Sequence, residues 1–329
     1  MVSGWILIMP LNPAVVHAGP EIEYGLQKTA DFLRHVLYDP NLELVREAEG
    51  WEEVWLLPDN LLATVALEPY YPEISRRIEG SLRRYGYTYS LLHEAILGEL
   101  IPAPRYSVTK YVIEEGDDYV IWTELCNDTD KEIPFWQEYA DRELYVSLIL
   151  KLYGDPHLES KVLELFNDVK GMWDGTGIND QAVKDRGGLY ETYKLALLLY
   201  VSRVLDQELE FREKLEEVLW SMQRTDGGFY TYYGSSYLDN KTGVPNAETA
   251  SLVLIAYKYT PQPRKLDIDE LSSLLITYGY TRSPTRIMTI GELSGETIGE
   301  LLGKIFSQWF ALIERYLWPF LSSFPIPIV

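Results

Sequence analysis

Hydrophobic residues recur along most of the chain at the spacing of α-helices, three and four positions apart. Four segments, at 58–67, 141–150, 191–200 and 248–257, are apolar on nearly every side and carry an acidic residue in their first turn. A helix that is apolar all round is buried on all sides. We therefore expect four inner helices, each with its acid at the positive end of the helix dipole.

The segments between these runs show a different pattern. Residues 72–85, 157–170 and 207–222 are amphipathic, with one charged face that we expect to meet solvent. Inner and outer helices thus alternate along the chain. Helical hairpins that repeat about every 50 residues form either a superhelix or a closed ring. Because the inner helices are apolar all round, the pattern favours the ring.

The expected elements are helices, with one exception. Alternating apolar and polar residues at 106–114 and 118–125, joined by Glu115-Gly116-Asp117, predict a β-hairpin. The helices are expected at about 22–38, 59–68, 72–85, 88–99, 136–153, 157–170, 189–205, 208–222, 246–259, 266–277 and 291–318. No linker rich in Pro, Gly or Ser divides the chain. We therefore expect one domain over 21–318, an apolar arm over 1–20 and an apolar, Pro-rich tail over 319–329.

One repeated motif suggests a family. Met-Gln-Arg-Thr-Asp-Gly-Gly-Phe-Tyr-Thr-Tyr-Tyr at 222–233, followed by Asn-Ala-Glu-Thr-Ala-Ser at 246–251, resembles the repeat of α/α toroid proteins. Gly-Met-Trp-Asp-Gly-Thr-Gly-Ile-Asn at 171–179, followed by 188–192, is a looser copy. The resemblance covers roughly residues 50–280. It implies an all-α toroid of five to six helical hairpins with a small β-hairpin insertion at about 106–125.

This class includes six-hairpin glycosidases, polysaccharide lyases, terpenoid cyclases and protein prenyltransferases, so the resemblance does not fix the chemistry. A prenyltransferase-like zinc site needs Asp, Cys and His together, but Cys126 lies away from the inner-helix starts and the four histidines are scattered. The sequence contains no aspartate-rich cyclase motif. The segment 174–180 offers oxygen ligands for calcium, but without EF-hand spacing. We therefore predict no metal and no cofactor.

Charge narrows the list of partners. The chain has 50 acidic and 29 basic residues, a net charge of −21, on an otherwise ordinary composition with 47% hydrophobic residues. Nucleic acids and anionic membrane surfaces bind clustered Lys and Arg, so neither is expected as a partner. The same charge opposes a lyase acting on acidic polysaccharides. A neutral glycan or another small molecule fits better.

The two ends of the sequence leave the location open. Residues 1–18 are apolar and end in Val16-His17-Ala18, a cleavage-like pattern, but they lack a positive start and contain two prolines. With the sequons at Asn127 and Asn240, this segment predicts an extracellular or cell-surface protein if it is cleaved, and a cytoplasmic one if it is not. The apolar tail over 319–329 is a candidate contact for a membrane or a protein partner.

Candidate site residues gather where inner helices begin. In a toroid, these helix starts and the loops before them line one mouth, which here is acidic and aromatic. As acid, base or sugar-binding groups we select Asp59, Glu191 and Glu248. The expected substrate-binding residues are Trp55, Asn60, Tyr139, Asp141, Trp173, Asp180, Tyr190, Tyr193, Asp226, Tyr230 and Asn246. Aromatic faces and carboxylates bind sugars, and glycoside hydrolysis needs two carboxyl groups. The sequence does not select the pair.

Three functions therefore stay open. The first is recognition or metal-independent hydrolysis of a neutral carbohydrate. The second is a non-catalytic surface or scaffold protein, in which the same acids and Asn246 stabilise helix ends and the C-terminal tail docks a partner. The third is a toroid that binds an isoprenoid or another apolar ligand in an aromatic core.

Overall fold

The computed structural model describes residues 19–86, 93–98, 109–125, 135–154 and 156–261. The chain divides into two compact units, Met1–Asp267 and Ile268–Val329, and every described residue belongs to the first. The expected arm up to residue 18, the tail over 319–329 and the helices expected at 266–277 and 291–318 lie outside the described residues.

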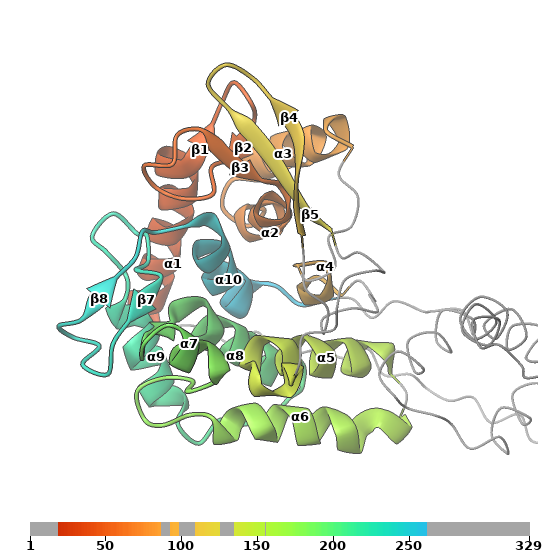
Figure 1. The fold of residues 1–329 in the computed structure, drawn as a ribbon, viewed down its shortest axis with the longest axis vertical. Coiled ribbons are helices and arrows are strands. Elements are labelled where there is room, and N and C mark those ends of the chain that lie inside the picture. The colour runs from red at the N-terminus through yellow and green to blue at the C-terminus, as the bar shows by residue number, and fades with distance from the viewer. Residues whose placement is uncertain (1–18, 87–92, 99–108, 126–134, 155, 262–329) are drawn as a thin grey trace, which may run out of the picture. The chain divides into compact units, whose positions relative to one another are not determined.

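Four buried helices form the centre of the described unit: α2 (Leu57–Leu67), α5 (Ala140–Tyr153), α8 (Thr192–Val204) and α10 (Ala247–Lys258). They correspond to the four segments that are apolar on nearly every side. Helix α10 packs between α2 and α8, and α5 packs on the other side of α8 (Figure 1). The short helix α4 (His93–Ile96) contacts both α2 and α5.

Amphipathic helices cover this centre, as the sequence pattern predicted for 72–85, 157–170 and 207–222. Each packs on one buried helix: α1 on α10, α3 on α2, α6 on α5 and α9 on α8. A π-helical turn, η1, continues α1. Their bounds are Pro20–Phe32 for α1, Leu33–Leu37 for η1, Pro72–Arg84 for α3, Glu159–Gly171 for α6 and Arg212–Ser221 for α9. Short helices also occur at Trp136–Glu138 (η2), Pro156–Leu158 (η3) and Gln181–Asp185 (α7).

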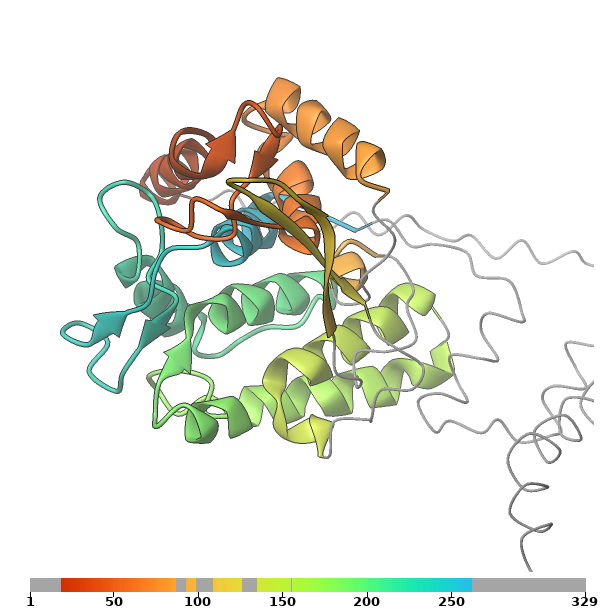
Figure 2. The ribbon, with the colours of Figure 1, turned by 45° about the horizontal axis from the view of Figure 1, so that its top comes forward.

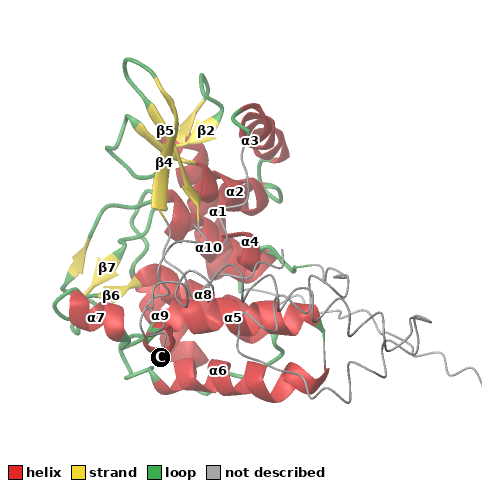
Figure 3. Ribbon diagram, turned by 45° about the vertical axis from the view of Figure 1, so that its right-hand side comes forward, coloured by secondary structure: helices red, strands yellow, loops and turns green. Residues whose placement is uncertain are grey.

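Short strands lie along one side of these helices (Figure 3). They form a two-stranded sheet β1–β2 and two three-stranded sheets, ordered β3–β5–β4 and β6–β7–β8. The bounds are Tyr38–Asp39 (β1), Leu44–Val45 (β2), Val54–Leu56 (β3), Thr109–Glu115 (β4), Val120–Leu125 (β5), Tyr190–Glu191 (β6), Tyr232–Tyr233 (β7) and Lys241–Thr242 (β8). Strand β3 leads directly into α2, and β6 leads directly into α8. These strands therefore position the amino ends of buried helices.

The prediction of an all-α toroid is wrong. Helices make up 55% of the described part and strands 14%, in three small sheets, so the fold is mixed α/β. The expected β-hairpin is present as β4 and β5, but it is not a separate insertion. Its strand β5 pairs in parallel with β3, and Figure 2 shows the hairpin beside α2. The other strands have two or three residues each, too few for an alternating sequence pattern to reveal.

The two stretches that resemble each other in sequence also fold alike. Each follows an outer helix and closes on itself through an isolated β-bridge, between Trp173 and Ile178 in one and between Gln223 and Phe229 in the other. In both, a backbone N–H after the bridge donates to the carbonyl of the methionine that directly follows the helix. Among the described helices, none combines the length and the apolar character that crossing a bilayer requires.

Candidate functional site

A polar cavity of about 210 Å³ lies where α2, α5 and α10 begin. Strand β3 ends at its wall, β4 and β5 run along it, and α4 contributes its first residue. The described residues that line it are Glu47, Leu56, Asp59, His93, Lys110, Glu124, Asp141, Arg142, Tyr145, Tyr193, Asn246 and Glu248. The cavity therefore collects acids and bases from segments that are far apart in the sequence.

His93 lies between two carboxylates. Its Nε2 is 3.6 Å from Oδ1 of Asp59 and 3.7 Å from Oε1 of Glu248. His93 is 5% exposed as a residue, and neither ring nitrogen has a hydrogen-bond partner within the described part of the chain. Because both contacts involve the same nitrogen, these two carboxylate oxygens are at most 7.3 Å apart, the sum of the two distances.

The electrostatics of the three groups follow from burial and proximity. Burial alone would lower the pKa of His93, but Glu248 and Asp59 outweigh it and raise that pKa to about 9. Burial, reinforced by Glu248, raises the pKa of Asp59 well above its usual value, although His93 opposes the shift. At neutral pH the cavity therefore holds an imidazolium and a carboxyl group that retains its proton more readily than an exposed aspartate does.

The remaining charged groups in the lining form two clusters of opposite charges: Lys110 with Glu47 and Glu124, and Arg142 with Asp141. Lys110 on β4 faces Glu124 of β5 in register, with Nζ 3.9 Å from that carboxylate and 3.6 Å from Glu47. Burial raises the pKa of Glu124, against the opposing effect of His93 and Lys110. On α5, Nε of Arg142 lies 3.6 Å from Oδ2 of Asp141. The sheet and α5 thus each supply a cation and an anion to the wall.

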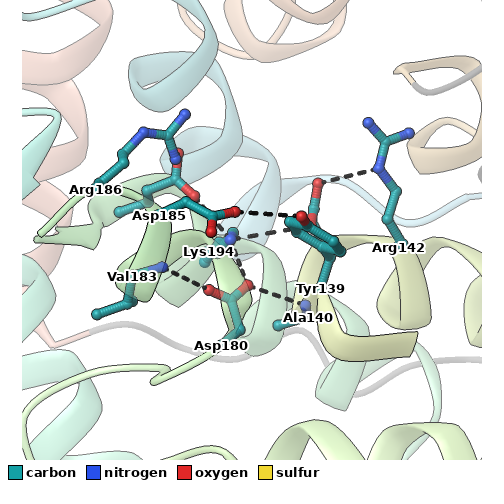
Figure 4. A network of polar contacts seen from close by, with 10 residues as sticks. Tyr139, Ala140, Arg142, Asp180, Val183, Asp185, Arg186 and Lys194 are labelled. Carbon is teal, nitrogen blue, oxygen red and sulfur yellow. Dashed lines mark hydrogen bonds and ion pairs between the residues drawn. The ribbon is translucent and has the colours of Figure 1, made fainter. Parts of the chain in front are cut away.

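A second cluster surrounds the buried ammonium group of Lys194. Its Nζ lies 2.5 Å from Asp180, 2.7 Å from Glu191 and 4.0 Å from Asp141. Figure 4 shows Lys194 beside Asp180, whose carboxylate also accepts hydrogen bonds from the backbone N–H groups of Ala140 and Val183. Burial opposes the charge of Lys194, but the three carboxylates raise its pKa and keep it ionised. This network joins α5, α7 and α8 and fixes Asp141 at the cavity.

Glu191, expected at the site, belongs to this second cluster. It also pairs with Arg186 at 2.5 Å and is not part of the described cavity lining. Asn60 holds the fold instead: its Oδ1 accepts from the Val45 N–H, and its Nδ2 donates to the carbonyls of Val45 and Leu56. Trp55 is 2% exposed and packs edge-on against Tyr119, so its faces are not a platform for a ligand.

The other expected binding residues lie around the loops and the β6–β7–β8 sheet. They have structural contacts: Tyr139 with Asp185, Trp173 stacked on Phe211, Tyr190 with Asp174 and Tyr233, Asp226 with Arg224 and the Gly228 N–H, and the Tyr230 carbonyl with Thr192. Tyr190 also borders a larger cavity of about 470 Å³, in which Lys184 is the one charged side chain of the described lining. That cavity has no described acid–base pair.

Five of the expected residues do meet in the polar cavity: Asp59, Asp141, Tyr193, Asn246 and Glu248. The sequence analysis missed the other charged groups there, above all His93. His93 falls within a segment that was expected to be helical. A lone histidine in such a segment does not reveal which acidic side chains lie beside it in the fold. Lys110 and Glu124 lie in the alternating pattern of the expected hairpin. The sequence does not show that β5 pairs with β3, the strand that leads to Asp59, and this pairing brings the hairpin to the cavity.

The described residues do not form a metal site. Among them, no group of three or more His, Cys, Asp and Glu side chains has an arrangement that would hold a metal ion. In the segment considered for calcium, Asp174 instead accepts from the N–H groups of Thr176 and Gly177 and from Tyr190. The described lining of the polar cavity offers carboxyl groups, an imidazole and cationic side chains.

Comparison with known proteins adds no relative. No protein-family model, no curated protein and no solved structure matches this chain. The function has to be argued from the cavity itself.

Proposed function

We propose that the polar cavity binds a small, hydroxyl-rich ligand of the carbohydrate class and acts on it by acid–base chemistry. The observation that carries the proposal is His93, a buried imidazole that lines the cavity and lacks hydrogen-bond partners in the described structure. Buried polar groups are almost always satisfied, by protein, water or ligand. Hydroxyl groups can donate to the carboxylates and accept from the imidazolium at the same time.

The two carboxyl groups beside His93 fit complementary roles. Asp59 is buried and its raised pKa suits a general acid. Glu248 is more exposed, with 27% of its side chain accessible, and suits a general base or nucleophile. Glycosidases place such groups about 5–5.5 Å apart for retention or about 6.5–9.5 Å for inversion. The limit of 7.3 Å on the two oxygens nearest His93 is compatible with retention and with the lower part of the inverting range.

The test uses nitrophenyl glycosides of neutral and of amino monosaccharides with the full chain. We expect nitrophenolate release, and Asp59→Asn and Glu248→Gln should each lower kcat by about a hundredfold or more, the usual contribution of a general acid or base. Glu79→Gln on the surface of α3, whose partner is Arg83, is the control and should keep full activity. Failure of wild-type protein to bind or cleave any member of the panel would refute the proposal, as would full activity of both site variants.

A non-catalytic interaction module is the second candidate function. Its support is that Asn60, Asp180 and Asn246, all expected at the site, bind backbone groups of the protein itself. In such a protein Asp59 and Glu248 would contribute to folding only. The two variants would then change the melting temperature but no measurable ligand binding.

A further inference from the structure

The described lining of the cavity contains more acidic than basic side chains. The acids are Glu47, Asp59, Glu124, Asp141 and Glu248, and the bases are His93, Lys110 and Arg142. Lys110 is close to Glu47 and Glu124, and Arg142 to Asp141. Among the described residues, the imidazolium of His93 is then the one cation within 4 Å of Asp59 or Glu248, and Asp59 retains its proton more readily than an exposed aspartate does.

His93 is a poor hydrogen-bonding partner for these two carboxyl groups. Its separations of 3.6 and 3.7 Å from the two carboxylates exceed hydrogen-bond length, and the residue as a whole is 95% buried, the complement of its 5% exposure. A charged donor that reached both oxygens directly would form the shorter, charge-assisted bonds that carboxylates prefer. A protonated amine has three N–H donors, enough for Asp59, Glu248 and a neutral His93 Nε2.

We propose that the ligand of this cavity carries a protonated amine on its hydroxylated ring, which makes it an amino sugar rather than a neutral sugar. The proposal rests on the proposed function and specifies its substrate class. The ammonium group would lie among Asp59, His93 and Glu248, while ring hydroxyls meet Tyr145, Tyr193 and Asn246 in the same lining.

Binding of the amine should also change the protonation of His93. An ammonium group beside His93 repels the imidazolium charge, so the imidazole releases its proton to solvent and Nε2 becomes an acceptor. The net charge of the cavity stays the same, because one cation replaces another. A neutral sugar gives no such exchange, since it leaves the imidazolium in place between the two carboxylates.

The experiment compares glucosamine, glucose and N-acetylglucosamine with the full chain by titration calorimetry at pH 7. We expect glucosamine to bind at least tenfold more tightly than either uncharged sugar. Repeating the glucosamine titration in buffers of different ionisation enthalpy should show net proton release. Glucose is the control matched in size, since a hydroxyl group replaces the amine, and N-acetylglucosamine keeps the nitrogen but loses its charge.

Variants test the contacts with the amine separately from the contacts with the sugar ring. Asp59→Asn and Glu248→Gln should abolish the preference for glucosamine, and His93→Asn should abolish the proton release that accompanies glucosamine binding. Equal binding of the three sugars, or binding without proton release, would overturn the amine proposal and leave the proposed function intact. Binding of none of them would overturn both. If His93→Asn does not fold, proton release by the wild-type protein still decides.

Discussion

Glu143 shows how much a single residue depends on its surroundings. It lies on α5 against α6, is 2% exposed, and its Oε2 has no hydrogen-bond partner in the described structure. Burial, reinforced by Asp168, raises its pKa from 4.5 to about 8, against the opposing charge of Lys161 and with a smaller effect of Glu164. These three charged groups all belong to α6. The folded chain therefore holds a proton on Glu143 that the unfolded chain loses near pH 4.5.

This difference makes stability depend on pH. Between pH 4.5 and 8 the folded state binds more protons than the unfolded state, so the free energy of unfolding falls as the pH rises. The contribution is fully present below pH 4.5 and declines through pH 8. Glu143→Gln, which is neutral at every pH, should remove this decline. We expect the variant to be more stable than wild type at pH 8.5, by about 1–3 kcal/mol.

Urea unfolding at pH 4.5 and at pH 8.5 measures the effect. The control is Glu164→Gln, on the exposed side of α6, where 57% of the glutamate side chain is accessible. It should leave the pH dependence nearly unchanged. A Glu143→Gln variant whose stability falls with pH as steeply as that of wild type would show that Glu143 is ionised in the folded protein.

At this scale the sequence predicts local roles better than distant contacts. Asn246 was recognised as an N-cap candidate, and its Oδ1 accepts from the Thr249 N–H three residues later. Trp55 was expected to stack on a sugar but is buried, because β3 carries it into a sheet. His93 was passed over, because Asp59 and Glu248 approach it from segments 34 and 155 residues away, the differences between the sequence positions.

The N-cap of helix α10 shows how a single helix end contributes to stability. It lies between α2 and α8, and the side chain of Asn246 satisfies one of the N–H groups left free in its first turn. We expect Asn246→Ala to lower the free energy of unfolding by about 1 kcal/mol, as loss of an N-cap usually does. The midpoint of urea unfolding reports the loss.

Asn246→Ser is the matched variant, because serine also caps helices well and should restore most of the stability. If both variants unfold at the same lower urea concentration, the loss comes from the contacts of Asn246 in the cavity rather than from the cap.

The helices could be predicted from sequence and most strands could not, for one physical reason. A buried helix such as α8 is an apolar segment of 13 residues, longer than a typical strand, so its length identifies it within one segment. Strands β6 and β7 have two residues each and exist because Tyr190 pairs with Tyr233 and Glu191 with Tyr232, across some forty residues. Pairing of that kind has no local period. The fold class was mistaken for the same reason, since strands that the pattern cannot show make it mixed α/β.

At the scale of the whole described unit, helix α1 packs against the turn that follows helix α9. Gln223 Nε2 donates to the Gly25 carbonyl and to Thr29 Oγ1 of α1, at 2.8 and 2.9 Å. In the same turn Gly227 has a φ of +97° and presses against α1, where a Cβ atom would lie 2.0 Å from the Lys28 carbonyl oxygen. About two hundred residues separate these partners, so the contact joins segments that no local pattern connects.

Gly227→Ala tests whether this closure stabilises the whole unit. Gly175, in the matching turn after α6, has nearly the same φ, +95°, but open space around its Cβ position. Gly175→Ala should therefore cost only the left-handed backbone strain, about 1–2 kcal/mol. Gly227→Ala adds a clash with backbone that no side-chain rotation relieves, so we expect a loss of about 3 kcal/mol or more. Urea unfolding should show one cooperative transition shifted to lower concentration, with α1 and α9 exchanging amide hydrogens faster together. Equal losses in the two variants would mean that α1 packs without depending on this turn.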